Sequence, residues 1–568
     1  MKDESNTAWE NWDSNQDDYP RKTLRRPNWL SLNGPWKFAF DDERVWNRPE
    51  KVPHYPHIIQ VPFCPESEMS GVHDQNFHPR CWYHRSFKLA KSKNRFILHF
   101  GAVDYEASVW VNQTFLGRHT GGHSSFSYDI TEALLESGEN TITVRADDDP
   151  VDLSKPRGKQ DWQLHPHSIW YMRTSGIWQT VWIEEVPQTY LQKIVWTPHL
   201  ERWEIGCEAF LAGTWAGNFQ LRVKLSAGEK VLVDDRYTFI NREITRRIAL
   251  SDPGIDDFRN ELLWSPEKPT LIEAELEVWD GDVLVERVRS YTALRSVAVK
   301  RGRFLLNGRP YYMRLILDQG YWPKSLMTAP DPLAFKKDIE LTKSAGFNGV
   351  RKHQKIEDPN YLYWADKLGL LVWVEMPSAY RFTHESVQRL TKEWAEIIDR
   401  DLNHPSVAVW VAFNESWGVP DLAEAGAHQN YVQAVYHLTR TLDPTRPVIG
   451  NDGWESTATD IIGIHDYDDN TDRIKGKYGT TVSKINDVLA QHRPAGRMLT
   501  VEGYPHEGQP LMLTEFGGIA CKAEGTKDGT WGYSTSKSGE DLKFRFVSLL
   551  KTINQIEIFC GFCYTQFT

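Results

Sequence analysis

The sequence predicts a multidomain protein with an N-terminal jelly-roll-like β-sandwich, an immunoglobulin-like β-sandwich and a C-terminal (β/α)8 TIM barrel. Its 568 residues suffice for three or four ordinary domains, or for fewer when a barrel takes about 250 of them. The first 296 residues alternate short β-type runs with turn residues and show no long helical period. From residue 297 onward, strand-like and helix-like segments alternate, which is typical of a parallel sheet or barrel.

The first predicted sandwich comprises residues 1–187. Short runs of β-forming residues are separated by Gly, Asn and Asp, which favour turns. The clearest runs are Gly34–Phe40, Arg95–Phe100, Ala107–Val111 and Asn140–Arg145. Several short strands with turn residues between them indicate a β-sandwich.

The second predicted sandwich comprises residues 188–296. Apolar and polar residues alternate in Phe219–Leu225, Lys230–Val233 and Ile272–Trp279, as expected of strands with one buried face. About 100 residues with this strand spacing favour an immunoglobulin-like domain.

The third region, residues 297–568, contains eight strand-like runs, the number that closes a (β/α)8 barrel. The runs are Tyr312–Asp318, Gly349–Arg351, Leu370–Glu375, Val407–Asn414, Pro447–Gly450, Ile461–His465, Leu511–Glu515 and Phe559–Gln566. Helix-like patterns lie between them at Leu333–Ala345, Asn360–Leu368, Glu385–Leu402, Ala423–Thr441 and Glu540–Thr552. The printed sequence ends with the eighth run, so we expect the barrel to lack its last helix.

A missing last helix would leave the outer faces of the first and eighth barrel strands without cover. Apolar surface left in water costs about 25 cal/mol per Å². We therefore expect Phe559, Phe562 and Phe567 to lie near an uncovered face. Such a face favours either a homo-oligomer that buries it or a protein of low solubility.

The composition restricts the class of protein. The net charge of −11 argues against nucleic acid and anionic membranes as main partners, because both select basic surfaces. No signal peptide is visible, no apolar run approaches eighteen residues, and six scattered cysteines do not make a disulfide framework. We expect a cytoplasmic protein. The 24 Trp, 22 Tyr and 24 Phe fit a protein that stacks aromatic rings on sugars, although large β-rich cores also use aromatics.

Two glutamates follow buried strands of the predicted barrel, at the strand ends where barrel active sites lie. Asn414 and Glu415 end one apolar run, and Glu515 ends another. A charge in such a place needs a partner or a task, and a pair of salt bridges at the barrel rim is the alternative interpretation. Two carboxyl groups that face each other across a pocket can catalyse glycoside hydrolysis. One attacks the sugar or positions a water molecule, and the other protonates the departing oxygen.

The sequence resembles glycoside hydrolase family 2, the family of β-galactosidases, β-glucuronidases and β-mannosidases. The barrel motifs that carry the resemblance are Asn403–Ser406 leading to Trp410 and Asn414–Glu415, and Thr514–Gly517. Motifs in the N-terminal part are Leu32–Phe38, Val109–Asn112 and Ser175–Gln179. The resemblance covers nearly the whole chain and implies a sugar-binding-like sandwich, an immunoglobulin-like sandwich and a catalytic barrel.

The resemblance also implies roles for individual residues. Glu415 would be the general acid/base and Glu515 the nucleophile of a retaining mechanism. Asn414 would donate a hydrogen bond to the sugar 2-hydroxyl, a contact that strengthens in the transition state. Arg351 and Tyr467 would keep the nucleophile carboxylate ionised by charge and hydrogen bonding. An Arg held in a structural pair and a core Tyr are the alternatives.

Further residues at strand ends are candidate substrate contacts. His353 follows the second barrel strand, where a hydrogen-bonded loop histidine is the alternative. Asp318 stands where many family members have a His-containing motif, and we expect it to replace a contact to the 3- and 4-hydroxyls. Trp454, after the fifth strand, is a candidate sugar contact. Tyr564 and Gln566 of the eighth strand are candidate wall residues.

These observations predict a retaining exo-β-glycosidase that hydrolyses terminal β-linked sugars of an oligosaccharide or β-glycoside, with β-galactosidase-like specificity. A β-glucuronidase or another β-glycosidase specificity is the alternative, because the segments around Asp318 and His353 depart from the common family pattern. A non-catalytic carbohydrate-binding protein is the alternative from another class. Some family members use Mg²⁺ or Na⁺, but no spacing in this sequence identifies metal ligands, so we expect no cofactor.

Overall fold

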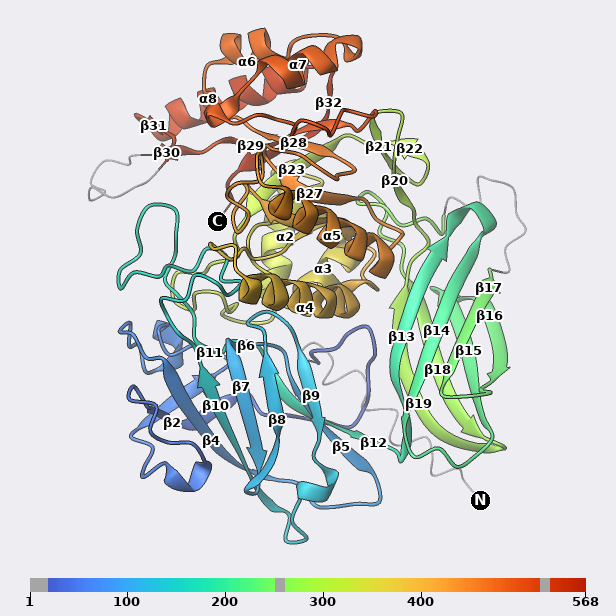
Figure 1. The fold of residues 1–568 in the computed structure, drawn as a ribbon. Coiled ribbons are helices and arrows are strands. Elements are labelled where there is room, and N and C mark those ends of the chain that lie inside the picture. The colour runs from blue at the N-terminus through green and yellow to red at the C-terminus, as the bar shows by residue number, and fades with distance from the viewer. Residues whose placement is uncertain (1–18, 251–260, 522–531, 568) are drawn as a thin grey trace.

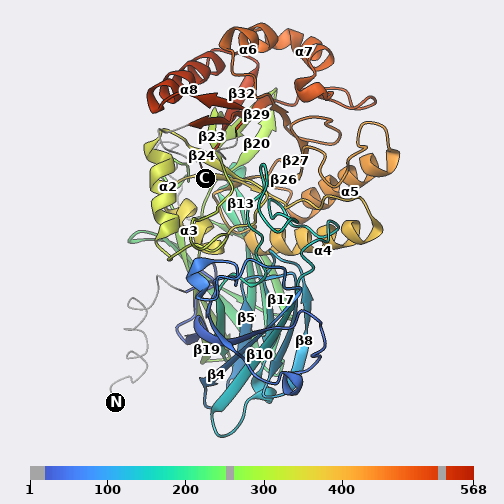
Figure 2. The ribbon, with the colours of Figure 1, turned by 90° about the vertical axis from the view of Figure 1, so that its left-hand side faces the viewer.

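The computed structural model describes residues 19–250, 261–521 and 532–567 and confirms the predicted fold class (Figure 1). Two β-sandwiches precede a barrel of eight parallel strands. The N-terminal sandwich lies beneath the barrel, and the second sandwich stands beside both (Figure 1). Figure 2 shows the helices of the barrel arranged around its strands.

The N-terminal sandwich consists of two antiparallel sheets. The four-stranded sheet has the order β1 (Trp29–Ser31), β12 (Val181–Val186), β5 (Arg95–Phe100) and β9 (Phe126–Asp129). The six-stranded sheet has the order β3 (His57–Val61), β2 (Gly34–Phe40), β4 (Arg80–Lys88), β10 (Glu139–Asp147), β7 (Glu106–Val111) and β8 (Thr114–Thr120). A short pair, β6 (Val103–Asp104) and β11 (Gly176–Ile177), faces the barrel end of the sandwich.

The second sandwich also consists of two antiparallel sheets. One has the order β13 (Thr189–His199), β14 (Glu204–Gly213) and β17 (Glu243–Ala249). The other has the order β16 (Lys230–Thr238), β15 (Phe219–Ala227), β18 (Ile272–Asp280) and β19 (Val283–Thr292). The alternating apolar residues of β15 and β18 turn inward, since Leu221, Val223, Leu276 and Val278 are buried in the same core. A small antiparallel sheet of β20 (Val297–Lys300), β21 (Arg303–Leu306) and β22 (Arg309–Pro310) leads into the barrel.

All eight predicted barrel strands are present. They follow the order β27 (Val448–Asp452), β26 (Val407–Asn414), β25 (Leu371–Glu375), β24 (Gly349–Lys352), β23 (Met313–Asp318), β32 (Phe559–Thr565), β29 (Leu511–Gly517) and β28 (Ile462–His465). The helices are α2 (Ala334–Ser344), α3 (Pro359–Leu368), α4 (His384–Asp401), α5 (Gly426–Leu442), α6 (Thr471–Tyr478), α7 (Ile485–Gln491) and α8 (Gly539–Ile553). A short parallel pair, β30 (Ile519–Cys521) and β31 (Ser534–Ser536), precedes α8.

The local sequence explains why these elements begin and end where they do. Every residue of β26 is buried, as expected of a parallel strand covered on both faces. Helix α4 begins with a capping box, in which Ser386 N–H donates to Thr383 Oγ1 (3.0 Å) and Ser386 Oγ accepts from the backbone N–H of Thr383 (2.9 Å). Helix α3 begins with Asp358 as N-cap and ends before Gly369, whose φ of +78° favours glycine.

The expectation of an uncovered face at the eighth strand is wrong for two of its three phenylalanines. Phe559 and Phe562 are buried within this single chain. The ring of Tyr478 lies 5.3 Å from that of Phe559, and the ring of Tyr312 lies 6.1 Å from that of Phe562. Tyr478 belongs to α6, which the sequence did not predict, so the connection between β28 and β29 supplies part of the cover.

A long connection, residues 148–175, joins β10 to β11 and reaches from the N-terminal sandwich to the barrel (turquoise in Figure 1). The buried Arg157 guanidinium shapes it by donating to the backbone carbonyls of Pro150, Asp152, Gln160 and Asp161 at 2.9–3.0 Å. The backbone N–H groups of Arg157 and Gly158 both donate to Ser378 O of the barrel at 3.1 Å. The sandwich and the barrel are thus joined by backbone hydrogen bonds at the barrel mouth.

Helix α4 also contacts the N-terminal sandwich, through two glutamates in contrasting environments. The His123 N–H donates to Glu393 Oε1 (2.6 Å), while Glu393 Oε2 is buried without a partner among the described residues. Burial raises the pKa of Glu393 to about 8. Ser124 Oγ donates to Glu396 Oε2 (2.7 Å), and hydrogen bonds from His119, Lys392 and Ser124 outweigh partial burial and lower the pKa of Glu396 to about 2.

In the part of the chain that the structure describes, no helix has the length and apolar character needed to cross a membrane.

The two glutamates predict opposite effects of a Gln substitution. Glu393, whose folded pKa lies above its unfolded value, favours folding less and less as the pH rises from about 4.5 to 8. We expect Glu393→Gln to raise the melting temperature relative to the parent, with a gain that grows between pH 5 and pH 8. About 1 kcal/mol corresponds to about 2–4 °C for a domain of 150–250 residues.

The matched control is Glu396→Gln on the same helix. Its lowered pKa contributes stability that is present above the unfolded pKa and lost as the pH falls through about 2. We expect this variant to melt below the parent at pH 7. Differential scanning calorimetry across the pH range measures both, and a Glu393→Gln gain that is independent of pH would contradict the assigned environment.

Candidate active site

The candidate site is a cavity of about 270 Å³ at the carboxyl ends of the barrel strands, where barrel active sites lie. Residues of both the barrel and the N-terminal sandwich line it. They are Lys159, Ser168, Ile169, Trp170, Tyr171, Leu317, Gln319, His353, Glu415, Trp417, Tyr467, Glu515, Tyr533, Thr565 and Gln566. The structure therefore brings both predicted glutamates to one cavity.

Glu415 directly follows β26, and its backbone is unusual. Glu415 and Ser416 have φ values of 51° and 58°, in the left-handed region that non-glycine residues rarely adopt. Such residues cost about 1–3 kcal/mol each and persist where their surroundings hold them. Here Asn451 Oδ1 accepts from the Ser416 N–H (3.0 Å), and Ser416 Oγ donates to Glu455 Oε2 (2.6 Å). The strand end is thus braced in a conformation that places the Glu415 side chain at the cavity.

Glu515 lies on β29 and is held by hydrogen bonds from both sides. Arg351 Nη1 donates to Glu515 Oε1 (3.0 Å), and Tyr467 Oη donates to Glu515 Oε2. Burial alone would raise the pKa of Glu515, but the nearby His465 and Arg351 outweigh it and hold the pKa below its ordinary value. Glu515 is therefore a buried carboxylate that stays ionised.

Arg351, on β24, is fully buried and binds the ends of four other strands. Its Nε donates to Glu375 Oε2 (2.6 Å), and its Nη1 lies 2.8 Å from Asp452 Oδ2 and 3.0 Å from Glu515 Oε1. Its Nη2 donates to Asn414 Oδ1 (2.6 Å). Burial would lower the pKa of Arg351, but the three carboxylates raise it well above its ordinary value.

His465, the last residue of β28, bridges the two glutamates, and the sequence analysis did not single it out. Its Nδ1 donates to Glu415 Oε1 (2.8 Å), and its Nε2 lies 3.5 Å from Glu515 Oε1 and 3.4 Å from Asp452 Oδ2. Burial opposes its charge, but Glu515, Asp452 and Glu415 raise the pKa of His465 to about 10. The rule that found the glutamates, a polar residue ending a buried barrel strand, also applies to this histidine.

Oxygen and nitrogen atoms of Glu415, His465 and Glu515 lie within 4.8 Å of one another, a spacing that metal ligands can adopt. With a pKa near 10, His465 is protonated on both ring nitrogens at neutral pH, so its Nδ1 donates to Glu415 Oε1 and its Nε2 faces Glu515 Oε1.

Asn414 and His353 lie beside this cluster. Asn414 is buried, and its Nδ2 has no hydrogen-bond partner in residues 19–250, 261–521 and 532–567. Because Arg351 occupies its Oδ1, the amide is oriented with its donor group free for a ligand. His353 lines the cavity, with Nδ1 3.0 Å from Glu375 Oε1 and 3.9 Å from Glu515 Oε1.

Three other predicted contacts lie outside the cavity lining. Asp318 is buried and accepts from Lys352 Nζ (2.6 Å), while its neighbours Leu317 and Gln319 line the cavity. Trp454 packs edge-on against His465 with ring centres 5.7 Å apart. Tyr564 packs on the phenyl rings of Phe516 and Phe546, whereas Gln566, two residues later, lines the cavity.

The sequence analysis also missed the sandwich residues of the cavity wall, among them Lys159 and Tyr171. Both belong to the connection 148–175, which has no strand pattern. Loops longer than about 12–15 residues without secondary structure are usually functional or disordered, and that length was the available signal.

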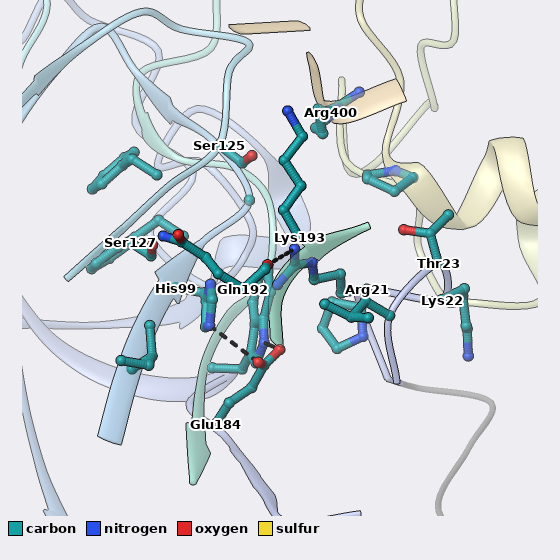
Figure 3. A pocket seen from close by; sticks show the side chains of 18 of the residues that line it. Arg21, Lys22, Thr23, His99, Ser125, Ser127, Glu184, Gln192, Lys193 and Arg400 are labelled. Atoms are coloured by element: carbon teal, nitrogen blue, oxygen red, sulfur yellow. Dashed lines mark hydrogen bonds and ion pairs between the residues drawn. The ribbon is translucent and has the colours of Figure 1, made fainter. Parts of the chain in front are cut away.

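A second, larger cavity of about 530 Å³ lies where the two sandwiches and the barrel meet (Figure 3). Several of its charged side chains pair with one another. Arg26 Nη1 donates to Glu184 Oε2 (2.7 Å), His99 faces the same carboxylate at 3.5 Å, and Lys193 forms an ion pair with Asp399. Neither Glu415 nor Glu515 lines it, so the smaller cavity carries the candidate chemistry.

Comparison with known proteins agrees with this geometry. The model "Glycosyl hydrolases family 2, TIM barrel domain" matches residues 297–531, and "Glycosyl hydrolase 2 galactose-binding domain-like" matches residues 57–183. The chain belongs to glycoside hydrolase family 2. Both family 2 matches fall on the domains whose residues meet at the cavity.

Individual relatives of this family 2 chain are distant. The β-galactosidase of Thermoanaerobacter pseudethanolicus is 26% identical over 470 residues, which are 79% of this chain and 58% of that protein. The chain spans about half the length of the curated relatives that it matches, 36–58%. The structure of the β-D-glucuronidase of Dictyoglomus thermophilum is 20% identical, with a TM-score of 0.73 over 97% of this chain and 92% of that one. The β-galacturonidase of Eisenbergiella tayi is 20% identical, with a TM-score of 0.72 over 97% and 90%.

Because Arg351 contacts three carboxylates and Asn414, we expect its replacement to lower the stability of the fold strongly. Removing one partner of a buried ion cluster leaves uncompensated charges and costs about 3–5 kcal/mol. We expect Arg351→Met to lower the free energy of unfolding by this amount in urea denaturation. Arg351→Lys, which keeps the charge but loses the fork geometry, should lose less.

Arg314 on the neighbouring strand β23 is an exposed control. We expect Arg314→Met to change the unfolding free energy by about 0.5 kcal/mol or less. Equal effects of Arg351→Met and Arg314→Met would show that the three carboxylates do not depend on Arg351.

Proposed function

We propose that this chain is a retaining exo-β-glycosidase in which Glu515 is the nucleophile and Glu415 the general acid/base. The observation that carries the proposal is the separation of the two glutamates. A carboxylate oxygen of Glu415 lies within 4.8 Å of one of Glu515. Retaining glycosidases hold their carboxyl groups about 5–5.5 Å apart, whereas inverting enzymes need about 6.5–9.5 Å to admit a water molecule.

The environments of the two glutamates support distinct roles. Glu515 accepts hydrogen bonds from Arg351 and Tyr467 and stays ionised, as a nucleophile must. In the first step its carboxylate attacks the anomeric carbon, the bond to the glycosidic oxygen breaks, and Glu415 gives that oxygen its proton. In the second step Glu415 takes a proton from water, the water oxygen attacks the same carbon, and Glu515 leaves as a carboxylate.

The free Asn414 Nδ2 supports a contact to the sugar 2-hydroxyl. This donor is buried next to both glutamates, and a buried donor without a partner costs about 1–3 kcal/mol. A hydroxyl of the bound sugar would satisfy it. Hydrogen bonds to the 2-hydroxyl that strengthen in the transition state contribute several kcal/mol in such enzymes.

Exo action is supported by the size of the site. The cavity of about 270 Å³ lies below the range of about 300–1,000 Å³ that is usual for ligand pockets, which suits a single sugar ring. The named relatives are a β-galactosidase, a β-glucuronidase and a β-galacturonidase, which act on different sugars. The sugar that this chain hydrolyses therefore has to be identified by experiment. A panel of nitrophenyl β-glycosides tests the proposal, and hydrolysis of none of them would favour a carbohydrate-binding protein.

Glu515→Ala tests the nucleophile. We expect turnover to be abolished, because no group remains that can form the glycosyl-enzyme. Added azide should occupy the place of the missing carboxylate and restore turnover. The product is then a glycosyl azide of inverted anomeric configuration, which NMR identifies. A product of unchanged configuration would contradict the role of Glu515.

Glu415→Ala tests the acid/base. General acid catalysis contributes about 10²–10⁴-fold, but a good leaving group departs with little protonation. We therefore expect the first step to be slowed strongly for poor leaving groups and little for dinitrophenolate, measured as burst kinetics with a series of aryl glycosides. Equal losses across the series would show that Glu415 does not protonate the departing oxygen.

A further inference from the structure

A buried lysine from the N-terminal sandwich lies in the wall of the active-site cavity. Lys159 is 6% exposed and lines the cavity together with Glu415 and Glu515. Its Nζ lies 4.7 Å from the centre of the Trp417 ring. Among the described residues, no carboxylate comes within ion-pair distance of this ammonium group. It is also the only lysine or arginine among the described residues that line the cavity.

An unpaired buried charge is costly unless the site gives it a task. Burial lowers the pKa of Lys159 to about 8, although the more distant Glu515, Glu415 and Glu375 favour its charged form. Lys159 therefore stays mainly cationic at neutral pH, without a counter-ion in direct contact. Glu515, which lines the same cavity, already has Arg351 as its counter-ion and accepts a hydrogen bond from Tyr467. It is therefore not the counter-ion of Lys159.

The backbone around Lys159 is held firmly at the barrel mouth. Gly158 has a φ of +58°, and a Cβ at this position would lie 2.1 Å from Gln354 O of the barrel. Tyr380 Oη donates to Gly158 O (2.7 Å), and the Tyr171 N–H donates to Lys159 O (2.8 Å). Only glycine permits so close an approach, so the chain enters the cavity at a fixed point.

The neighbouring wall is polar and neutral. Gln319 Nε2 donates to Gln566 Oε1 (2.7 Å), and Gln566 Nε2 donates to Tyr171 Oη (3.2 Å). Gln319 Oε1 is buried without a partner among the described residues. This part of the wall thus offers amide and hydroxyl groups for sugar hydroxyls, and the single fixed cation stands beside them.

We propose that Lys159 binds the carboxylate of a β-linked hexuronic acid, so that a loop of the sandwich selects acidic over neutral sugars. This inference rests on the proposed glycosidase function of the same cavity. An ammonium–carboxylate hydrogen bond is charge-assisted and contributes more than a bond to a neutral hydroxyl. Binding the anion would also supply the counter-ion that the fold does not.

The test compares substrates that differ only in this charge. We would measure kcat/KM for nitrophenyl β-D-glucuronide and β-D-galacturonide, for the methyl ester of each, and for the β-D-glucoside and β-D-galactoside. Hydrogen bonds to charged groups are worth about 1.5–3 kcal/mol, so the parent should prefer an acid over its methyl ester by about 10–100-fold. Lys159→Met should remove this preference, and Lys159→Arg should keep part of it.

The matched control is Lys324→Met. It removes an exposed lysine from the connection between β23 and α2 and should leave the preference for the acid over the ester unchanged. The parent alone can overturn the proposal, by cleaving a methyl ester or a neutral glycoside as well as the corresponding acid. Equal losses of Lys159→Met on acid and ester would overturn it too, since Lys159 would then act on both alike.

A separate measurement distinguishes failure of the inference from failure of the proposed hydrolysis. Free glucuronate and galacturonate should raise the melting temperature of the parent and of Glu515→Ala, but not of Lys159→Met. Protection without hydrolysis of any glycoside would overturn the proposed function and keep the acidic-sugar site. Hydrolysis of neutral glycosides without protection by either uronate would keep the proposed function and overturn the acidic-sugar site.

Discussion

The site depends on one buried cation, the guanidinium of Arg351. It joins side chains from β25, β26, β27 and β29 to its own strand, β24, through contacts of 2.6–3.0 Å. Five of the eight barrel strands are thus fixed relative to one another at the end where the cavity lies. A carboxylate such as Glu515 can remain ionised in this interior only because the opposite charge is built into the same layer.

The charges of the site extend beyond that cation. His465 carries a second positive charge between Glu415 and Glu515, and Glu515, Asp452 and Glu415 stabilise that charge. The strained backbone at Glu415 and Ser416 is tolerated because Asn451 and Glu455 hold it from behind. Packing, hydrogen bonding and charge therefore converge on the placement of two carboxyl groups.

The architecture was readable from the sequence because the barrel strands are continuous apolar runs ended by polar residues. That rule located Glu415, Glu515 and Asn414, the family resemblance added Arg351, and the structure brings all four together. The resemblance also favoured Asp318, but its neighbour Gln319 is the residue that reaches the cavity. The rule could not place Lys159, because the approach of the sandwich loop is set by contacts with Ser378 and Gln354, far away in the sequence. Helices α6 and α7 were missed because both are short, with eight and seven residues.

The approach of residues 148–175 to the barrel mouth has a consequence for how this protein can change over evolutionary time. The carboxylates proposed to perform the chemistry are anchored in the barrel sheet, where a substitution disturbs several strands at once. The groups of the sandwich loop are anchored by hydrogen bonds from the Arg157 guanidinium to the loop's own carbonyls and by the contact with Ser378, which lies beyond the end of strand β25. Under the proposed function, substitutions in the loop can therefore alter which sugar is accepted without touching Glu415 or Glu515, and new specificities can arise on an unchanged pair of carboxyl groups.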